Sequence, residues 1–200
     1  MNYIQVKELS KSYSNIKALK NLSMEISAGK LFGILGPNGA GKSTLIKILA
    51  TLIEPDSGEV FINKINLKRN PREIRELIGY VAQDVALDKI LTGRELLDFQ
   101  ADLYHINKNK KIERIEKLID QLKMSNWIDR KCGTYSGGMK RRIDLAAGLL
   151  HLPKVLILDE PTVGLDIESR NIIWQLLKDL RNDGMTIILS SHYLDEIDKL

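Results

Sequence analysis

Apolar residues follow two patterns along the chain, and these patterns predict strands and helices in a regular order. Residues 3–9 and 22–26 alternate apolar and polar side chains, which is typical of strands with one buried face. Short, mainly apolar runs instead predict strands that are buried on both faces. These runs are residues 31–35, 78–82, 155–158 and 185–191.

Helical spacing of apolar residues appears between and after these runs. Leu45, Ile46, Ile48 and Leu49 give one predicted helix an apolar face, and Ile172, Ile173, Leu176, Leu177 and Leu180 do the same for another. In the intervening segment the apolar residues again recur at helical spacing, and no strand pattern interrupts them before residue 134. They are Leu96, Phe99, Leu103, Ile112, Ile115, Ile119 and Leu122. We expect one domain over residues 1–200, with a helical subdomain at 84–150 and a core formed by 1–83 and 151–200.

Composition restricts the class of protein. The 200 residues are 44% hydrophobic, enough for one compact core, and no run approaches the 18 apolar residues of a membrane span. The N-terminus opens without a secretory signal, so we expect a cytoplasmic location. Cys132 is the single cysteine, which excludes an internal disulfide and a cysteine-rich zinc cluster.

The formal charge of +4 raises the question of a nucleic-acid partner. Lysine and arginine are interleaved with acids except at Lys108, Lys110 and Lys111, which open a predicted helix. A solvated turn is the better interpretation of that short stretch. No nucleic-acid partner is therefore expected.

Residues 36–44 fit the phosphate-loop pattern G-x-x-x-x-G-K-[ST] between a predicted strand and a predicted helix. Glycines allow successive backbone N–H groups to surround an anion. Lys42 would bind the β- and γ-phosphates of a nucleotide, and the hydroxyl of Ser43 would bind Mg²⁺. The fold class is thus α/β, a P-loop NTPase core of mostly parallel sheet with an N-terminal antiparallel β region and the helical subdomain. The loop comprises Gly36, Pro37, Asn38, Gly39, Ala40, Gly41, Lys42, Ser43 and Thr44.

Polar side chains stand at the C-terminal ends of three predicted strands, where ligands gather in open α/β sheets. Asp159 is expected to hold Mg²⁺ through water, and Glu160 to accept a proton from the attacking water. The Gln83 amide can accept from a metal-bound water and donate to another oxygen. His192 occupies the equivalent position on the last predicted strand.

Two further signals leave alternatives open. Tyr13 could stack on an adenine ring or could simply pack in a hairpin. Ser136, Gly137 and Gly138 precede a predicted helix, so they form either a second anion site or an ordinary turn.

Taken together and in order, these motifs resemble the nucleotide-binding domain of ATP-binding cassette (ABC) transporters over essentially the whole chain. The resemblance implies that Tyr13 stacks on adenine, that Glu160 is the catalytic base and that His192 is the switch histidine. It also assigns Gly36–Thr44 to Walker A, Gln83 to the Q-loop, Tyr135–Met139 to the ABC signature, Asp159 to Walker B and Val163–Asp166 to the D-loop.

The resemblance further implies a dimer that sandwiches two ATP molecules with Mg²⁺. Ser136, Gly137 and Gly138 would then contact the γ-phosphate held by the other protomer, and the D-loop residue Asp166 would lie at the same site. The partner would be a second copy or a second ABC ATPase. A separate transmembrane permease would hold the chain on the cytoplasmic face of the membrane, and ATP hydrolysis would energise export.

The sequence departs from the usual family pattern in three places. The signature reads YSGGM instead of LSGGQ, so Met139 cannot supply a side-chain amide. Asp144 and Ala147 replace the usual alanine and arginine of the following helix. The form YSGGMKRRIDLA resembles drug-, antibiotic- and lipid-type exporters with separate ATPase and membrane chains. The chain stops at DEIDKL, inside a predicted helix, so we expect the C-terminal end of the domain to be missing.

A non-transport ABC ATPase is the alternative. DNA-repair types need long coiled coils or zinc modules, and translation types carry two cassettes in one chain. The single cassette, single cysteine and short helical insertion argue against both. A role in Fe–S cluster assembly, or another scaffold or motor role, remains open at this point.

Overall fold

A computed structural model of the chain describes residues 2–192, which form two sheets with helices on either side of the second. The antiparallel sheet has the order β2-β1-β4-β5, and the parallel sheet has the order β3-β8-β7-β6. The strands of the first are β1 (Asn2–Tyr13), β2 (Ile16–Ser27), β4 (Ser57–Ile62) and β5 (Ile65–Asn66); those of the second are β3 (Leu31–Leu35), β6 (Ile78–Val81), β7 (Val155–Asp159) and β8 (Thr186–Ser191). The predicted α/β fold is confirmed. The expected helix at residues 195–200 lies outside the described part of the chain.

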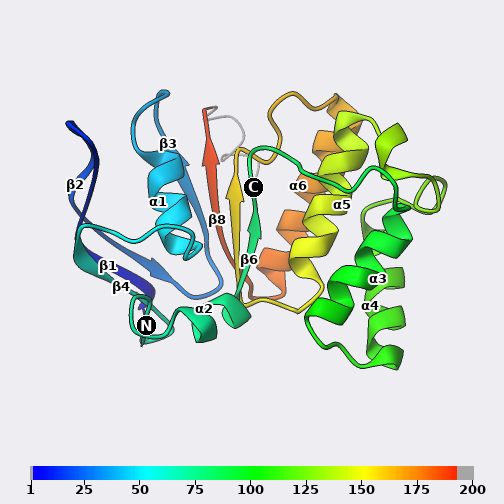
Figure 1. Ribbon diagram of the computed structural model, residues 1–200, viewed down its shortest axis with the longest axis horizontal. Helices are drawn as coiled ribbons and strands as arrows, with labels where there is room; N and C mark the ends of the chain where they lie inside the picture. Colours follow the sequence, from blue (N-terminus) through cyan, green and yellow to red (C-terminus); the bar gives the residue numbers. More distant parts are fainter. Residues whose placement is uncertain (1, 193–200) are drawn as a thin grey trace.

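The parallel sheet stands in the middle of the molecule, and its two faces belong to different cores (Figure 1). Val155 and Ile157 of β7 pack with the antiparallel sheet and with α1 (Lys42–Leu49). Leu156 and Leu158 point the other way, toward α5 (Gly137–Leu149) and α6 (Ile167–Asn182). Burial on both faces explains why this strand is a continuous apolar run.

The N-terminal hairpin is longer than the alternating pattern predicts. The structure extends β1 to Tyr13 and begins β2 at Ile16. Register shifts interrupt the pairing of the two strands, and Glu8 adopts a φ of 48° at one of them. Such bulges break strict alternation without ending a strand, so the pattern alone stops too early.

β3 also differs from expectation. Residues 31–35 were expected to form a fully buried strand, yet within the described residues β3 pairs only with β8 and lies at the edge of the parallel sheet. Its side chains are half-buried, and Leu35 is exposed. An edge strand has a neighbour on one side only, which leaves part of it open.

The remaining helices are α2 (Pro71–Leu77), α3 (Gly93–Leu103) and α4 (Lys108–Gln121), with a short 3₁₀ turn at Cys132–Thr134. The face expected for α3 is partly wrong: Phe99 and Leu103 are exposed, and the helix buries Gly93, Leu97 and Ala101 instead. Small residues permit a close approach to neighbouring helices, whereas the sequence pattern gives most weight to large apolar side chains.

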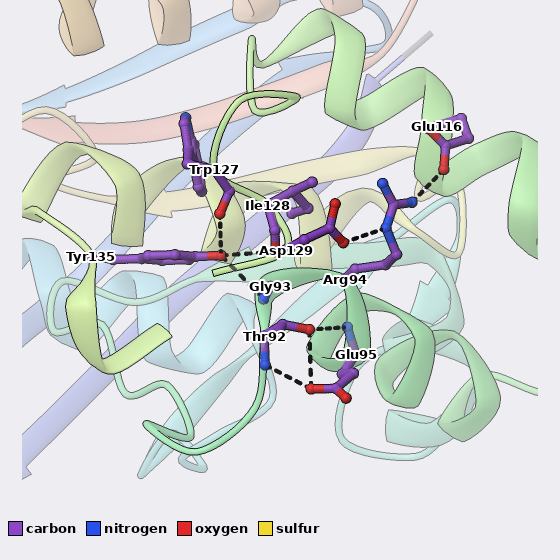
Figure 2. A network of polar contacts seen from close by, with 9 residues as sticks. All are labelled: Thr92, Gly93, Arg94, Glu95, Glu116, Trp127, Ile128, Asp129 and Tyr135. Carbon is purple, nitrogen blue, oxygen red and sulfur yellow. Dashed lines mark hydrogen bonds and ion pairs between the residues drawn. The ribbon is translucent and has the colours of Figure 1, made fainter. Parts of the chain in front are cut away.

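The start of α3 and the segment before α5 are joined by polar contacts (Figure 2). The Tyr135 hydroxyl accepts from the Gly93 N–H at 3.1 Å and donates to the carbonyl oxygen of Ile128, also at 3.1 Å. Thr92 and Glu95 cap the first turn of α3 reciprocally. Tyr135, the residue immediately before Ser136, is therefore held against the helical layer, which is formed by α3, α4 and α5.

Candidate nucleotide-binding site

The phosphate loop connects the end of β3 to the start of α1, and its shape requires glycine. Gly41 has a φ of 87°, and a Cβ atom at this position would lie 2.4 Å from the carbonyl oxygen of Ala18. The Lys42 ammonium donates to the carbonyl oxygens of Gly36 at 2.7 Å and Pro37 at 3.0 Å. Lys42 is buried, so its positive charge is held inside the loop. A phosphate bound there would be surrounded by the loop N–H groups and this ammonium.

A pocket of about 270 Å³ lies against this loop. Residues 38–44 form most of its wall, and Ala18, Gln83 and Glu160 complete it. The phosphate loop and two of the predicted strand-end residues therefore face the same space. Ala18 was not predicted from the sequence, because it lines the pocket only through the close approach of β2 to Gly41.

Asp159 and Glu160 follow each other at the end of β7, and both are buried. The Ser43 hydroxyl lies 3.4 Å from Asp159 Oδ1, so a hydroxyl and a carboxylate oxygen meet beside the loop. Mg²⁺ prefers such oxygen ligands and takes its others from phosphate and water. The residues present thus fit Mg²⁺. Within residues 2–192 no group of three or more His, Cys, Asp or Glu side chains could hold a metal ion unaided.

Glu160 is held in an unusual backbone conformation, with a φ of 50°. The hydroxyl of Ser190 on β8 accepts the Glu160 N–H at 2.9 Å and donates to Asp159 Oδ1 at 2.6 Å. A non-glycine residue at positive φ is strained and persists only where its surroundings determine it. Ser190 was not predicted from the sequence, although a polar residue at the end of a buried apolar strand indicates a buried hydrogen bond.

The Glu160 carboxylate is contacted by residues that follow the two neighbouring strands. Gln83, after β6, donates from Nε2 to Glu160 Oε2 at 3.2 Å. His192, after β8, places Nε2 against Glu160 Oε1 and Nδ1 at 3.2 Å from the Gly36 carbonyl oxygen. The structure thus brings together the three strand ends and the phosphate loop.

Other predicted site residues do not line this pocket, among them Tyr13, Ser136, Gly137 and Asp166. Tyr13 is 47% exposed at the end of β1, with the Lys11 ammonium 5.9 Å from its ring. Ser136 is the N-cap of α5, and Asp166 is the N-cap of α6. Hydrogen bonds from the Ser169 backbone N–H and hydroxyl hold the pKa of Asp166 below its usual value. Ser136 and Asp166 therefore each have a local structural role as a helix N-cap in their own chain.

Gly138 lies outside the pocket as well, and the two signature glycines differ in their surroundings. A Cβ atom on Gly138 would lie 2.0 Å from the Ser169 hydroxyl, so this glycine is required for packing of α5 on α6. A Cβ atom on Gly137 would meet nothing within 4 Å. Ser136 and Gly137 are therefore both exposed, with open space around Gly137.

Arg141 is a buried cation on α5 that the sequence reasoning also missed. Its guanidinium donates to the carbonyl oxygens of Ala82 and Gln83. Arg141 lies four residues before Leu145, on the buried face of α5. A cation within an apolar stripe of a helix is the sequence signal that could have indicated its burial. Asp144 is nearby, with Oδ2 3.6 Å from the Arg141 Nη1 atom. Burial raises the Asp144 pKa to about 6, although the positive charge of Arg141 lowers it.

A glycine-rich loop between a strand and a helix, facing carboxylates at the end of a nearby parallel strand, defines a P-loop nucleotide-binding domain. Residues 19–163 match the ABC transporter family. The chain therefore belongs to the ABC transporter family, as its motifs suggest.

Three relatives of the chain are named as ATP-binding proteins of drug resistance or export. The chain is 40% identical over 197 residues to the daunorubicin resistance ATP-binding protein DrrA2 of Streptomyces coeruleorubidus, covering 98% of this chain and 61% of the relative. It is 38% identical to the linearmycin resistance ATP-binding protein LnrL of Bacillus subtilis, covering 98% of this chain and 63% of the relative. It is 35% identical to the Nod factor export ATP-binding protein I of Rhizobium etli, covering 100% of this chain and 63% of the relative. The chain thus spans less than two thirds of the length of these proteins.

Solved structures agree on the fold. A dimeric post-hydrolysis state of the ATP-binding cassette MJ0796, bound to ADP and Pi, superposes with a TM-score of 0.89 at 28% identity, covering 98% of this chain and 90% of the other. The protein cbiO1 from Clostridium perfringens, part of the ABC transporter complex cbiONQ, gives a TM-score of 0.87 at 32% identity, covering 98% of this chain and 80% of the other. Among the described residues, no helix has the length and apolar character that a membrane crossing requires.

Proposed function

We propose that this chain is the ATP-binding and hydrolysing subunit of a membrane exporter, and that ATP closes two such subunits into a dimer. The observation that carries the proposal is that residues 38–44, Gln83 and Glu160 line the same pocket. It combines an anion-binding loop with a carboxylate that can accept a proton.

In this proposal the loop N–H groups and Lys42 bind the phosphates of ATP. Ser43 and Asp159 would hold Mg²⁺, directly or through water, and Gln83 would contact its hydration shell. The ion would supply positive charge that offsets the phosphate oxygens. Tyr13, exposed at the end of β1, is the residue proposed to stack on the adenine ring.

Glu160 is the proposed general base. Its carboxylate would accept a proton from the attacking water, while His192 and Gln83, which already contact its two oxygens, keep it oriented. Such positioning is what phosphoryl transfer mainly requires of the protein.

The dimer supplies the groups that lie outside the pocket of one chain. Ser136 and Gly137 are exposed, with space around Gly137, so they could receive the γ-phosphate held by a second protomer. Gly138 and Asp166 would shape that surface from behind, because they pack on each other through Ser169. The dimeric, nucleotide-bound cassette to which this fold is similar supports this arrangement.

The role in export rests on the relatives, which are named for drug resistance and Nod factor export. A separate permease would hold the chain at the cytoplasmic face of the membrane, and a homodimer is the simplest assembly. ATP-driven closing and opening of the dimer would then move the permease between its states.

Lys42→Ala tests the nucleotide site. Loss of the ammonium should weaken MgATP binding and abolish phosphate release, because the γ-phosphate loses its charge partner. Fluorescent-nucleotide titration and a phosphate-release assay measure both effects. Lys47→Ala, an exposed lysine on the same helix, is the matched control. Undiminished affinity and turnover in Lys42→Ala would remove Lys42 from the site.

A further inference from the structure

Arg141 joins the signature helix to the segment that carries Gln83. From α5 its guanidinium donates to the carbonyl oxygen of Ala82, and at 2.7 Å to that of Gln83. The side chain is only 5% exposed, so these bonds are made away from water. Charge-assisted bonds from a planar guanidinium to two acceptors fix both distance and orientation.

Gln83 is consequently held at two points. Its backbone carbonyl is bound by Arg141, and its side-chain amide donates to Glu160 Oε2 at 3.2 Å. A path of direct contacts therefore runs from α5 through one residue to the carboxylate in the nucleotide pocket. The first residue of α5 is Gly137, and its N-cap is Ser136. A shift of the signature helix would thus reach Gln83 without passing through the rest of the helical layer.

We propose that Arg141 is a positioning residue that sets Gln83 relative to Glu160 according to the placement of α5. The proposal rests on the proposed function, since Gln83 and Glu160 matter to turnover only if the pocket hydrolyses ATP. Asp144, one turn along α5, places its carboxylate 3.6 Å from the guanidinium and partly balances its charge.

The next residue provides a natural comparison. Arg142 is also partly buried on α5, but its guanidinium donates to the carbonyl oxygens of Leu122 and Lys123, both at 3.3 Å. It also lies 5.0 Å from the Trp127 ring. Arg142 therefore joins α5 to the end of α4, within the helical layer. Replacing either arginine removes a cation of α5 and its carbonyl contacts, but only Arg141 contacts Gln83.

A double-mutant cycle in the intact protein tests the path. Arg141→Met should lower kcat for MgATP by about tenfold or more and change KM much less, because misplacement of Gln83 affects the reacting geometry more than binding. In a Gln83→Ala background the same change should lower kcat by less than about twofold. Arg142→Met should have the same effect in both backgrounds. An equal loss from Arg141→Met with and without Gln83 would overturn the proposal.

Amide hydrogen exchange without nucleotide gives a readout that does not depend on turnover. Arg141→Met should accelerate exchange at residues 82–88 by about threefold or more, whereas Arg142→Met should act near residues 122–128. Arg141→Lys keeps the charge but not the two-pronged geometry, and serves if the methionine variant does not fold; it should give intermediate exchange. Unchanged exchange at 82–88 in both Arg141 variants would overturn the proposal.

A wild-type protein without ATPase activity but with this exchange pattern would contradict the proposed function and leave the Arg141 contact established.

Discussion

The hydroxyl oxygen of Ser190 lies 2.6 Å from Asp159 Oδ1, in a position that is completely buried. The same oxygen accepts the backbone N–H of Glu160 at 2.9 Å. One side chain on β8 thus fixes two consecutive acidic residues at the end of β7. Because Glu160 has a φ of 50°, this hydroxyl also stabilises a backbone conformation that glutamate rarely adopts.

Ser190→Ala should therefore reduce both stability and turnover. Removing the hydroxyl leaves a buried N–H and a buried carboxylate oxygen without this partner, which costs about 1–3 kcal/mol. We expect kcat to fall more than MgATP affinity, since the phosphate loop is unchanged. Denaturant unfolding and steady-state kinetics measure the two effects. Ser190→Thr keeps the hydroxyl and should retain most activity; an alanine variant with parental kcat would refute the role.

Tyr135→Phe should destabilise the helical layer. The hydroxyl joins Gly93 to Ile128, and burial raises the Tyr135 pKa to about 12, so the group stays protonated and can donate at neutral pH (Figure 2). Loss of these buried bonds should cost about 1–3 kcal/mol in urea unfolding. Tyr104→Phe is the control, because Tyr104 is exposed and its ring, which phenylalanine keeps, stacks on His151. Equal stabilities of the two variants would contradict this account.

Asp144→Asn should change how stability depends on pH. Burial raises the Asp144 pKa from 3.8 to about 6, so the folded state holds this proton more tightly than the unfolded state. The stabilisation from this tighter proton binding is complete below the pKa of Asp144 in the unfolded state, and it is lost as pH rises through about 6. The asparagine variant does not ionise and should gain on the order of 2 kcal/mol relative to the parent between pH 4 and pH 8. Parallel stability profiles for the two proteins would exclude this effect.

The meeting of the strand-end side chains at the phosphate loop could be predicted from the sequence, because the motif places residue types at fixed spacing. The phosphate loop had to follow a strand and precede a helix, and Gln83, Glu160 and His192 had to follow buried strands. Parallel strands bring such ends to one edge of a sheet. Local sequence was therefore sufficient to place these groups together.

The supporting contacts could not be predicted in the same way. Arg141 binds carbonyl groups 58 and 59 positions away, and Ser190 contacts residues 30 and 31 positions away. No local pattern encodes such partners. The face of α3 was misjudged for a related reason, since Gly93 and Ala101 are buried through close packing rather than through their own hydrophobicity.

Glu160→Gln tests the proposed base and the proposed dimer together. The amide keeps the shape of the side chain but cannot accept a proton, so MgATP should bind while hydrolysis stops. In the proposed site the carboxylate would also repel the γ-phosphate, so removing its charge should let an ATP-bound dimer accumulate. Light scattering with and without MgATP measures the dimer, and phosphate release measures turnover.

Adding Ser136→Arg to this variant should abolish the dimer, because a long side chain at the exposed N-cap of α5 would occupy the space proposed for the partner's γ-phosphate. Ser125→Arg, the same change at an exposed position outside the signature and the pocket, is the control and should leave the dimer intact. MgATP binding to the monomer should persist in both double variants, since Lys42 and the loop are unchanged. Parental hydrolysis by Glu160→Gln would exclude Glu160 as the base. A dimer that forms without ATP, or that tolerates Ser136→Arg, would exclude a nucleotide site shared between two signature and phosphate-loop surfaces.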